Sequence, residues 1–327
     1  MAVGRMADTA EKRMPLKWRV VLVALAWMAG GCSSRPDIPS RTGTILAGYL
    51  EAPGLDEISG LAASRIRPDL LWAVADSGNP PLLYAVGIDG AHRGAYRIEG
   101  VDNRDWEDLA SFSDDGRPCL LIADTGDNDA RHPVCFLHIL REPELPPGTA
   151  AARGILKVER TIRFVYEDGP RDCEAVAVDP EEGQVFLLSK REVPVSLYRL
   201  SMGPAAGSAI QIARKVTDVA QIPGPTSEDL RKDRRYGRYG SQVTAMDLAA
   251  DGSGALVLTY KNAYRYPRRP GERWEDVFRQ SPERIPLPPL RQAEALCLSP
   301  AGKSIFVSSE QRPNPLLRLE PDSEGRY

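Results

Sequence analysis

The chain has 327 residues, a formal net charge of −3 and only three histidines. A charge so close to neutral argues against a general nucleic-acid binder and against an acidic solvating tail. The sequence also has no Gly-x-Ser-x-Gly, no His-Glu-x-x-His and no phosphate-binding glycine loop followed by Lys and Ser or Thr. Serine hydrolase, zinc peptidase and nucleotide-driven chemistry are therefore disfavoured.

The first residues are typical of a secretory signal. Lys17 and Arg19 precede an apolar run over residues 20–28 that is too short to span a bilayer. The run meets Ala29-Gly30-Gly31-Cys32, which resembles a bacterial lipoprotein signal, whose cysteine receives lipid. We predict a signal peptide over 1–31, a lipid-anchored tether over 32–42 and an exported, membrane-anchored protein, periplasmic or at the cell surface. The alternative is a conventional cleaved signal.

From residue 43 onward, one sequence pattern recurs five times. A polar residue opens a short apolar run, a turn rich in Asp, Gly or Pro follows, and a second apolar run ends in a polar residue. Such pairs of runs predict β-hairpins, and a repeated unit of this size predicts a propeller blade. The opening residues are Ser59, Glu107, Glu174, Thr244 and Glu294, and the closing residues are Asp76, Asp124, Lys190, Tyr260 and Glu310.

Third and fourth runs follow several of the hairpins, so each blade should have four antiparallel strands. The last unit has room for only three before Tyr327, whereas the strand-like run Thr44–Leu50 is left over ahead of the first unit. Pairing that run with the last blade would close the ring and hide both sheet edges. We therefore predict an all-β propeller over 43–327 with five blades, six being the alternative, closed by the N-terminal strand.

Hairpin geometry predicts where a ligand would bind. The start of the first strand and the end of the second lie at the same edge of a hairpin, so opening and closing residues should converge on one mouth of the central channel. Glu107 and Glu174 are candidates for a general acid and base there. Their polarity is equally expected of strand ends that face a water-filled pore. The predicted ligand-binding residues are Asp76, Asp124, Lys190, Tyr260, Lys261, Glu294 and Glu310.

Two loop clusters suggest what the mouth could bind. Asp124, Asp127 and Asn128 offer the oxygen ligands that Ca²⁺ prefers, although the same stretch is also a typical Asp/Gly turn. A basic arc over residues 231–238 and 261–269 is suited to a small anionic ligand, or to a protein, unless it is a solvated insertion. No nucleic-acid partner is expected.

Four cysteines remain beyond Cys32, each within or beside an apolar run. Two disulfides are one interpretation, and buried free thiols are the one we favour. Among the histidines, His132 in a mouth loop is the only plausible proton shuttle.

The paired runs Ile58–Ala62 with Leu71–Asp76, and Glu294–Leu296 with Ile305–Glu310, together with Glu174–Val178, resemble exported bacterial propellers of the phytase-like esterase group. The resemblance implies a calcium-assisted phosphoesterase-like site at the channel mouth. The Asp-Ala-Asp-Asp-Pro-Ala signature of the alkaline propeller phytases is absent. The sequence thus predicts a ligand-binding, lipid-anchored propeller, with a Ca²⁺-dependent hydrolase as the alternative.

Overall fold

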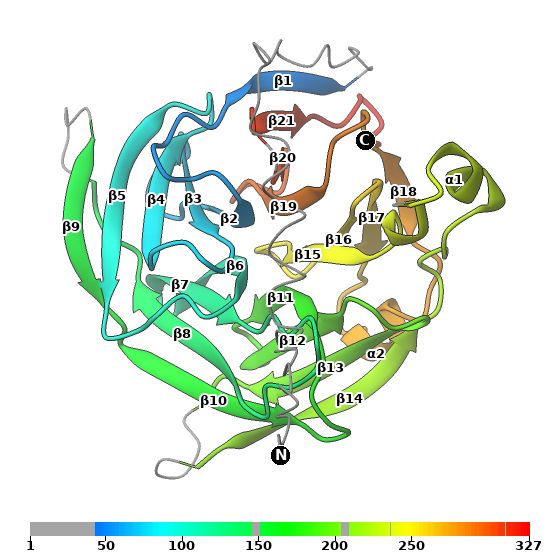
Figure 1. Cartoon of the computed structure of the whole chain (residues 1–327), viewed down its shortest axis with the longest axis horizontal. Coiled ribbons are helices and arrows are strands. Elements are labelled where there is room, and N and C mark those ends of the chain that lie inside the picture. The colour runs from blue at the N-terminus through cyan, green and yellow to red at the C-terminus, as the bar shows by residue number, and fades with distance from the viewer. Residues whose placement is uncertain (1–42, 146–150, 204–208, 236, 311) are drawn as a thin grey trace, which may run out of the picture. The chain divides into compact units, whose positions relative to one another are not determined.

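Strands dominate the part of the chain that the structure describes, and they group into sheets arranged around a central axis (Figure 1). The structure is a computed structural model, and its described residues belong to one compact unit. The predicted signal peptide, tether and Cys32 lie outside the described residues, which are 43–145, 151–203, 209–235, 237–310 and 312–327.

Blade 1 is a four-stranded antiparallel sheet with one added strand. Its inner strands β2 (Ile58–Ala63) and β3 (Leu70–Ala75) are buried along their whole length, as expected where a blade is covered by neighbours on both faces. The next strands are β4 (Leu82–Gly87) and β5 (His92–Glu99). The strand β9 (Ala152–Lys157) lies in the chain between β8 (Cys135–Arg141) and β10 (Arg160–Tyr166) of blade 2, but it pairs with β5 in parallel. The sequence pattern did not predict β9, which has a largely exposed, polar face.

Blades 2 and 3 form one continuous sheet. Their outermost strands pair with each other in parallel, so neither blade has a free outer edge at that point. Blade 2 consists of β6 (Trp106–Asp114), β7 (Arg117–Asp124), β8 (Cys135–Arg141) and β10 (Arg160–Tyr166), and blade 3 consists of β11 (Cys173–Asp179), β12 (Gln184–Ser189), β13 (Val195–Ser201) and β14 (Gln211–Val219).

Blade 4 comprises β15 (Val243–Leu248), β16 (Gly254–Thr259), β17 (Asn262–Pro267) and the short β18 (Glu283–Pro286). The segments around it hold α1 (Ser227–Lys232), the 3₁₀ turn η3 (Gly237–Tyr239) and α2 (Trp274–Val277).

The helix α1 begins with a capping box, in which Thr226 and Asp229 bond each other's backbone N–H groups. The helix α2 anchors its loop, because the buried Trp274 donates its indole N–H to Asp179 of blade 3 at 2.7 Å.

Blade 5 confirms the predicted closure by the N-terminal strand. It contains β19 (Ala293–Leu298), β20 (Ile305–Ser309) and β21 (Pro315–Leu319), and β1 (Thr44–Tyr49) pairs with β21 antiparallel. The inner strands β2, β6, β11, β15 and β19 contact one another in a closed cycle. The described residues thus form a five-bladed β-propeller, and the alternative of six blades does not hold.

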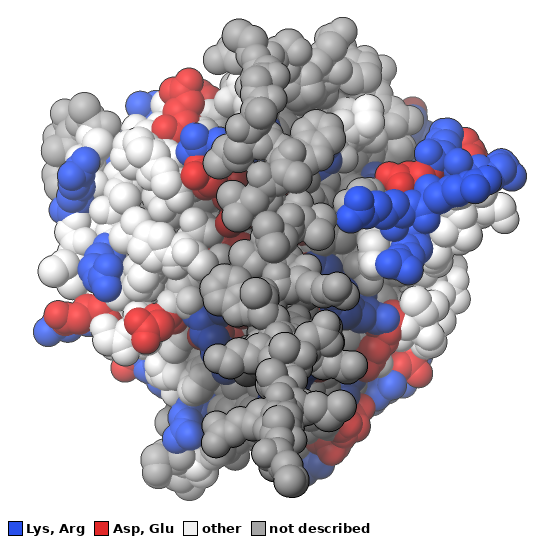
Figure 2. Space-filling model, in the orientation of Figure 1, with Lys and Arg blue, Asp and Glu red and all other residues white. Residues whose placement is uncertain are grey.

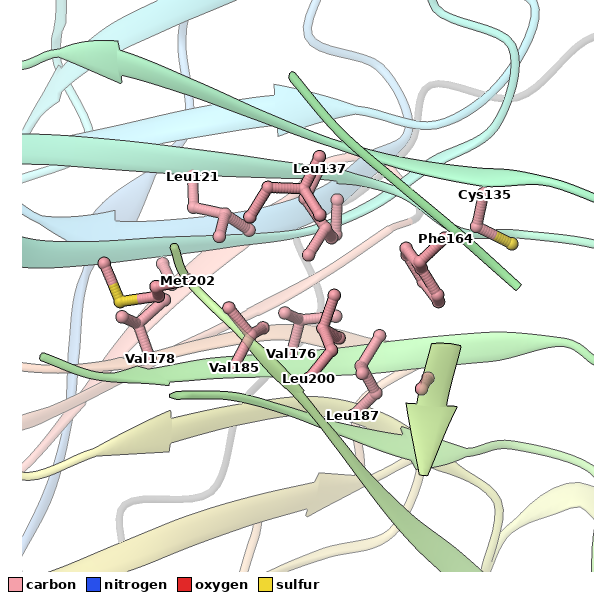
Figure 3. Packing of buried hydrophobic residues seen from close by; sticks show 14 of the residues in the cluster. Leu121, Cys135, Leu137, Phe164, Val176, Val178, Val185, Leu187, Leu200 and Met202 are labelled. Carbon is pink, nitrogen blue, oxygen red and sulfur yellow. The ribbon is translucent and has the colours of Figure 1, made fainter. Parts of the chain in front are cut away.

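Hydrophobic clusters between adjacent blades hold the ring together. In the cluster between blades 2 and 3, Leu121 and Leu137 face Val176, Val185 and Leu187 (Figure 3). Burial of one such side chain stabilises the folded state by about 1.5–3 kcal/mol. The hydrophobic core therefore lies between the blades rather than along the axis.

The four cysteines of the propeller are buried and free, which confirms the interpretation as thiols; they are Cys119, Cys135, Cys173 and Cys297. Among the described residues, no helix is long and apolar enough to cross a membrane.

Candidate functional site

Each inner strand carries a β-bulge at its first positions. The register shifts between the residues on either side of Ser59, Glu107, Glu174, Thr244 and Glu294. A bulge leaves one residue outside the ladder and redirects its side chain, and bulges often occur beside functional sites. The five opening residues predicted from the repeat therefore share one structural position at the start of the innermost strands.

One residue further along, the channel is narrow. Four blades place a small residue at this level, and blade 2 places Asp108, which is fully buried. Its carboxylate accepts N–H groups from Leu109 of its own strand at 2.8 Å, Val176 of β11 at 2.8 Å and Met246 of β15 at 3.2 Å. The residue Gly60 has no room for a side chain, because a Cβ would lie 2.7 Å from the nitrogen of Leu109. Asp108 thus links three blades across the axis, below the mouth.

Above this level, acidic and basic side chains from three blades meet. Lys190, directly after β12, forms an ion pair with Glu174, and both side chains are buried. The Lys190 ammonium also lies 5.1 Å from the ring centre of Tyr260. Tyr260 in turn donates its hydroxyl to Glu294 at 2.8 Å. The structure therefore brings together four of the residues predicted for the mouth.

Burial and mutual repulsion disfavour charge on the carboxylates of this group. Burial is the main cause that raises the pKa of Glu107 well above its ordinary value, and the negative charges of Glu174 and Asp76 raise this pKa further. Burial likewise raises the pKa of Glu174, although Lys190 opposes the shift. Burial, followed in size by the negative charge of Glu310, raises the pKa of Glu294 to about 8.

Two further groups at the mouth show how charge is shared there. Burial, followed in size by the negative charge of Asp76, raises the pKa of Glu310 to about 7. For Lys190, burial works against the charge, but Glu174 and the neighbouring acidic groups outweigh it and raise the pKa of Lys190. Within the described part of the chain, the site therefore holds the buried ammonium of Lys190 firmly charged, next to more carboxylates than that ammonium can balance.

Two sets of three carboxylates lie close enough to share a cation, and Glu107 belongs to both. One oxygen atom of each carboxylate lies within 4.8 Å of the others in the set Asp76, Asp105 and Glu107, and again in the set Glu107, Asp172 and Glu174. In the second set Asp172 already accepts Nε–H of Arg191 at 2.7 Å.

The residues predicted to bind Ca²⁺ have partners of their own in the structure. Asp124 forms an ion pair with Arg104 at 3.1 Å. Asp127 accepts the backbone N–H of Arg131 at 2.8 Å and so closes the loop as an Asp turn does. Asn128 accepts a hydrogen bond from Arg191. A metal ion at Asp124, Asp127 and Asn128 stays a prediction.

The basic arc does not form one patch, because part of it lies near α1 and part on and after β17, where Arg265 pairs with Glu283 and Arg268 pairs with Asp179 and Glu182. Lys and Arg side chains gather over α1, which Figure 1 places outside the ring of inner strands (Figure 2). Lys261 forms an ion pair with Asp229 of that helix. A cavity of about 420 Å³ is lined both by Lys190 of the mouth and by Arg238 of the arc, together with Val195, Ile222 and Tyr239 among others.

Sequence reasoning did not select Asp105, Asp172 or Asp108 as site residues. A signal for two of them was present, because Asp105 and Asp172 each stand two positions before an opening glutamate, in the same Asp-x-Glu arrangement. No comparable local signal marks Asp108, whose role depends on backbone groups of two other blades.

A five-bladed propeller with a polar, acidic channel mouth is the class of protein that these features define. No protein-family model matches the chain, and no curated protein matches it. Comparison with solved structures found chains that are similar to this one. They include U3-55K, with 11% identity and a TM-score of 0.38 over 80% of this chain and 67% of that one.

The WD40 repeats of RRP9 have 12% identity and a TM-score of 0.39, with 80% of this chain and 67% of that chain covered. A luciferin-regenerating enzyme has 10% identity and a TM-score of 0.43, with 84% of this chain and 93% of that chain covered. The blade count and the closure by β1 are established by the strand pairing of this chain itself.

Proposed function

We propose that the protein is a ligand-binding propeller and that its ligand presents a positively charged group to the channel mouth. The observation that carries this proposal is the charge of the mouth among the described residues. Lys190 and Arg191 are the basic side chains that pair with its carboxylates. The carboxylates gathered there are Asp76, Asp105, Glu107, Asp172, Glu174, Glu294 and Glu310.

The physical argument is one of desolvation. An ionised carboxylate removed from water costs several kcal/mol unless an opposite charge or hydrogen-bond donors compensate it. The raised pKa values of Glu294 and Glu310 express that cost. A bound cation would offset this desolvation cost. Asp108 lies below the mouth and would limit how deeply a ligand enters the channel. Binding needs only this fitted, charged surface, whereas catalysis would also need a positioned base and substrate.

Calorimetry on the purified full chain tests the proposal, with spermidine as a cationic probe and inorganic phosphate as an anionic one. We expect spermidine to bind and Glu294→Gln to weaken that binding. The matched control is Asp69→Asn, which changes an exposed carboxylate paired with Arg67. Binding of phosphate in place of spermidine would contradict the proposal and favour the small anionic ligand predicted from the basic arc.

A Ca²⁺-dependent phosphoesterase is the second candidate. Glu107 and Glu174 lie in one set of neighbouring carboxylates, and burial raises the pKa of both, which suits a group that donates a proton at neutral pH. Hydrolysis of p-nitrophenyl phosphate that requires Ca²⁺ and disappears in Glu107→Gln would support this activity. Calcium-independent or absent turnover would count against it.

We also propose that the protein is exported and anchored to a membrane through lipid on Cys32. The charged, apolar and small-residue segments that precede this cysteine support the proposal. In that setting the propeller would bind its ligand outside the cytoplasm.

A further inference from the structure

The cavity of about 420 Å³ lies where blades 3 and 4 meet, and we call it the interblade cavity. Its walls come from residues 190–195 between β12 and β13, from residues 222–225 after β14 and from residues 238–242 before β15. The strands β12 and β15 are in contact, which places these loops side by side. Pockets for small ligands measure about 300–1,000 Å³, so the interblade cavity has room for a small organic molecule.

Arg238 brings a positive charge to the interblade cavity that no carboxylate balances among the described residues. Its guanidinium lies 4.6 Å from the ring centre of Tyr239 and donates a hydrogen bond to the hydroxyl of that residue. The acidic residue of the lining, Glu192, forms an ion pair with Arg171 instead. The planar fork of an arginine binds a carboxylate through two parallel hydrogen bonds. Arg238 is therefore suited to an anionic group of a ligand.

The rest of the lining combines neutral donors with apolar side chains. The hydroxyl of Ser241 and the amide of Gln242 belong to the lining and are groups that donate hydrogen bonds to an oxyanion. Val195 and Ile222 supply buried apolar surface, whereas Val193 is 81% exposed. A hydrocarbon chain packed against these residues would remove apolar surface from water, which is favourable. The lining thus fits a ligand with an anionic group and a hydrocarbon body.

Lys190 belongs both to the channel mouth and to the interblade cavity. Its ammonium pairs with Glu174 and lies 5.1 Å from the ring centre of Tyr260, within the mouth. The same residue lines the cavity. The acidic mouth and the cavity with its unbalanced arginine therefore adjoin at this residue, and one ligand can reach both.

We propose that the ligand of the mouth is a zwitterion, whose cationic group meets the mouth carboxylates and whose anionic group meets Arg238 in the interblade cavity. This inference rests on the proposed function and names the class of its ligand, a small molecule with an amine and a carboxylate separated by a hydrocarbon chain. The chain joins two contacts that are each weak alone. Linking them makes the second contact intramolecular and raises the affinity without any new contact.

Calorimetry on the full chain at pH 8 tests the proposal with matched probes. The ω-amino acids from 4-aminobutanoate to 8-aminooctanoate are each compared with the alkylamine and the alkanoate of the same chain length. We expect at least one ω-amino acid to bind at least about tenfold more tightly than both of its matched probes, because only the zwitterion uses both sites. The series of lengths finds the separation of charges that spans the mouth and the cavity.

Substitution of Arg238 locates the anionic end of the ligand. Arg238→Gln should remove the advantage of the ω-amino acid over the alkylamine, and Arg238→Lys, which keeps the charge but loses the fork, should retain part of it. An indirect structural effect would instead weaken both probes equally and keep their ratio. The control Arg93→Gln alters an exposed arginine that pairs with Asp89 on blade 1 and should bind both probes as the wild type does.

Each other outcome overturns a defined part of the reasoning. If alkylamines bind but no ω-amino acid binds more tightly, the zwitterion inference fails and the proposed function stands. If the advantage of the ω-amino acid persists in Arg238→Gln, the placement of the anionic group in the interblade cavity is wrong. If alkanoates bind and neither alkylamines nor spermidine do, or if no probe binds, the proposed function fails together with this inference.

Discussion

Replacing Lys190 by Met should destabilise the protein, because the change leaves the carboxylate of Glu174 buried without its cation. The two side chains retain only 7% and 6% of their exposure in the ion pair. Removing one partner of a buried ion pair costs about 3–5 kcal/mol, which is a large part of the total stability of about 5–15 kcal/mol typical of a domain.

The loss should depend on pH in a defined direction. Burial raises the pKa of Glu174 while Lys190 lowers it, so Lys190→Met raises the folded-state pKa further. The folded variant then binds this proton more tightly than the unfolded chain, whose glutamate pKa is about 4.3. Stability must therefore fall as pH rises above that value towards the folded-state pKa. We expect a loss of about 3 kcal/mol at pH 8 and a smaller loss at pH 5.

Urea denaturation, followed by tryptophan fluorescence at both pH values, measures this effect. The set should contain wild type, Lys190→Met, Glu174→Gln and the double variant. The double variant replaces the charged pair by a neutral one and should be more stable at pH 8 than Lys190→Met alone. Equal losses at the two pH values, or a double variant that is less stable than Lys190→Met, would refute the argument.

Four other predictions concern the fold, the mouth and the N-terminus. Asp108→Ala should lower the free energy of unfolding, measured by urea denaturation, by at least about 3 kcal/mol, because each of the three buried N–H groups left without an acceptor costs about 1–3 kcal/mol. A decrease below about 1 kcal/mol would show that these hydrogen bonds contribute little to stability. A chain shortened to begin at Leu50 lacks β1 and exposes the edge of β21, so size-exclusion chromatography should show oligomers, and a stable monomer would count against the closure. The pKa of Glu294 is about 8 and that of Glu310 is about 7, so both side chains ionise between pH 6 and pH 9. The affinity for spermidine, measured by calorimetry, should therefore rise over that interval. An unchanged affinity would place the ligand elsewhere. Cys32→Ser should move the protein from the membrane fraction to the soluble fraction, and retention would argue against lipid attachment.

The blades could be predicted from the sequence because their signals are local. Apolar runs of strand length, bounded by Asp, Gly and Pro turns, specify hairpins without knowledge of distant residues. The run Thr44–Leu50 could be assigned to blade 5 because that blade lacked one strand. The outer strands β9 and β14 were missed, since most of their residues are exposed or half-buried and each pairs in parallel with a strand of another blade.

The candidate site was only partly predictable. Repeat position placed Glu107, Glu174 and Glu294 at equivalent strand starts, because the hairpin pattern recurs. It did not reveal that Lys190 forms an ion pair with Glu174, or that Glu107 belongs to two sets of neighbouring carboxylates.

The sequence by itself therefore predicted five blades with six as the alternative, the strand that closes the ring and the polar positions at the channel mouth. Only the tertiary structure decided which of those charges balance one another, and it placed the link across the axis at Asp108. The physical reason is the range of the interactions. Turns and apolar periodicity act over a few residues, whereas ion pairs and hydrogen bonds between blades depend on bulges and side-chain directions that exist only once the ring has closed.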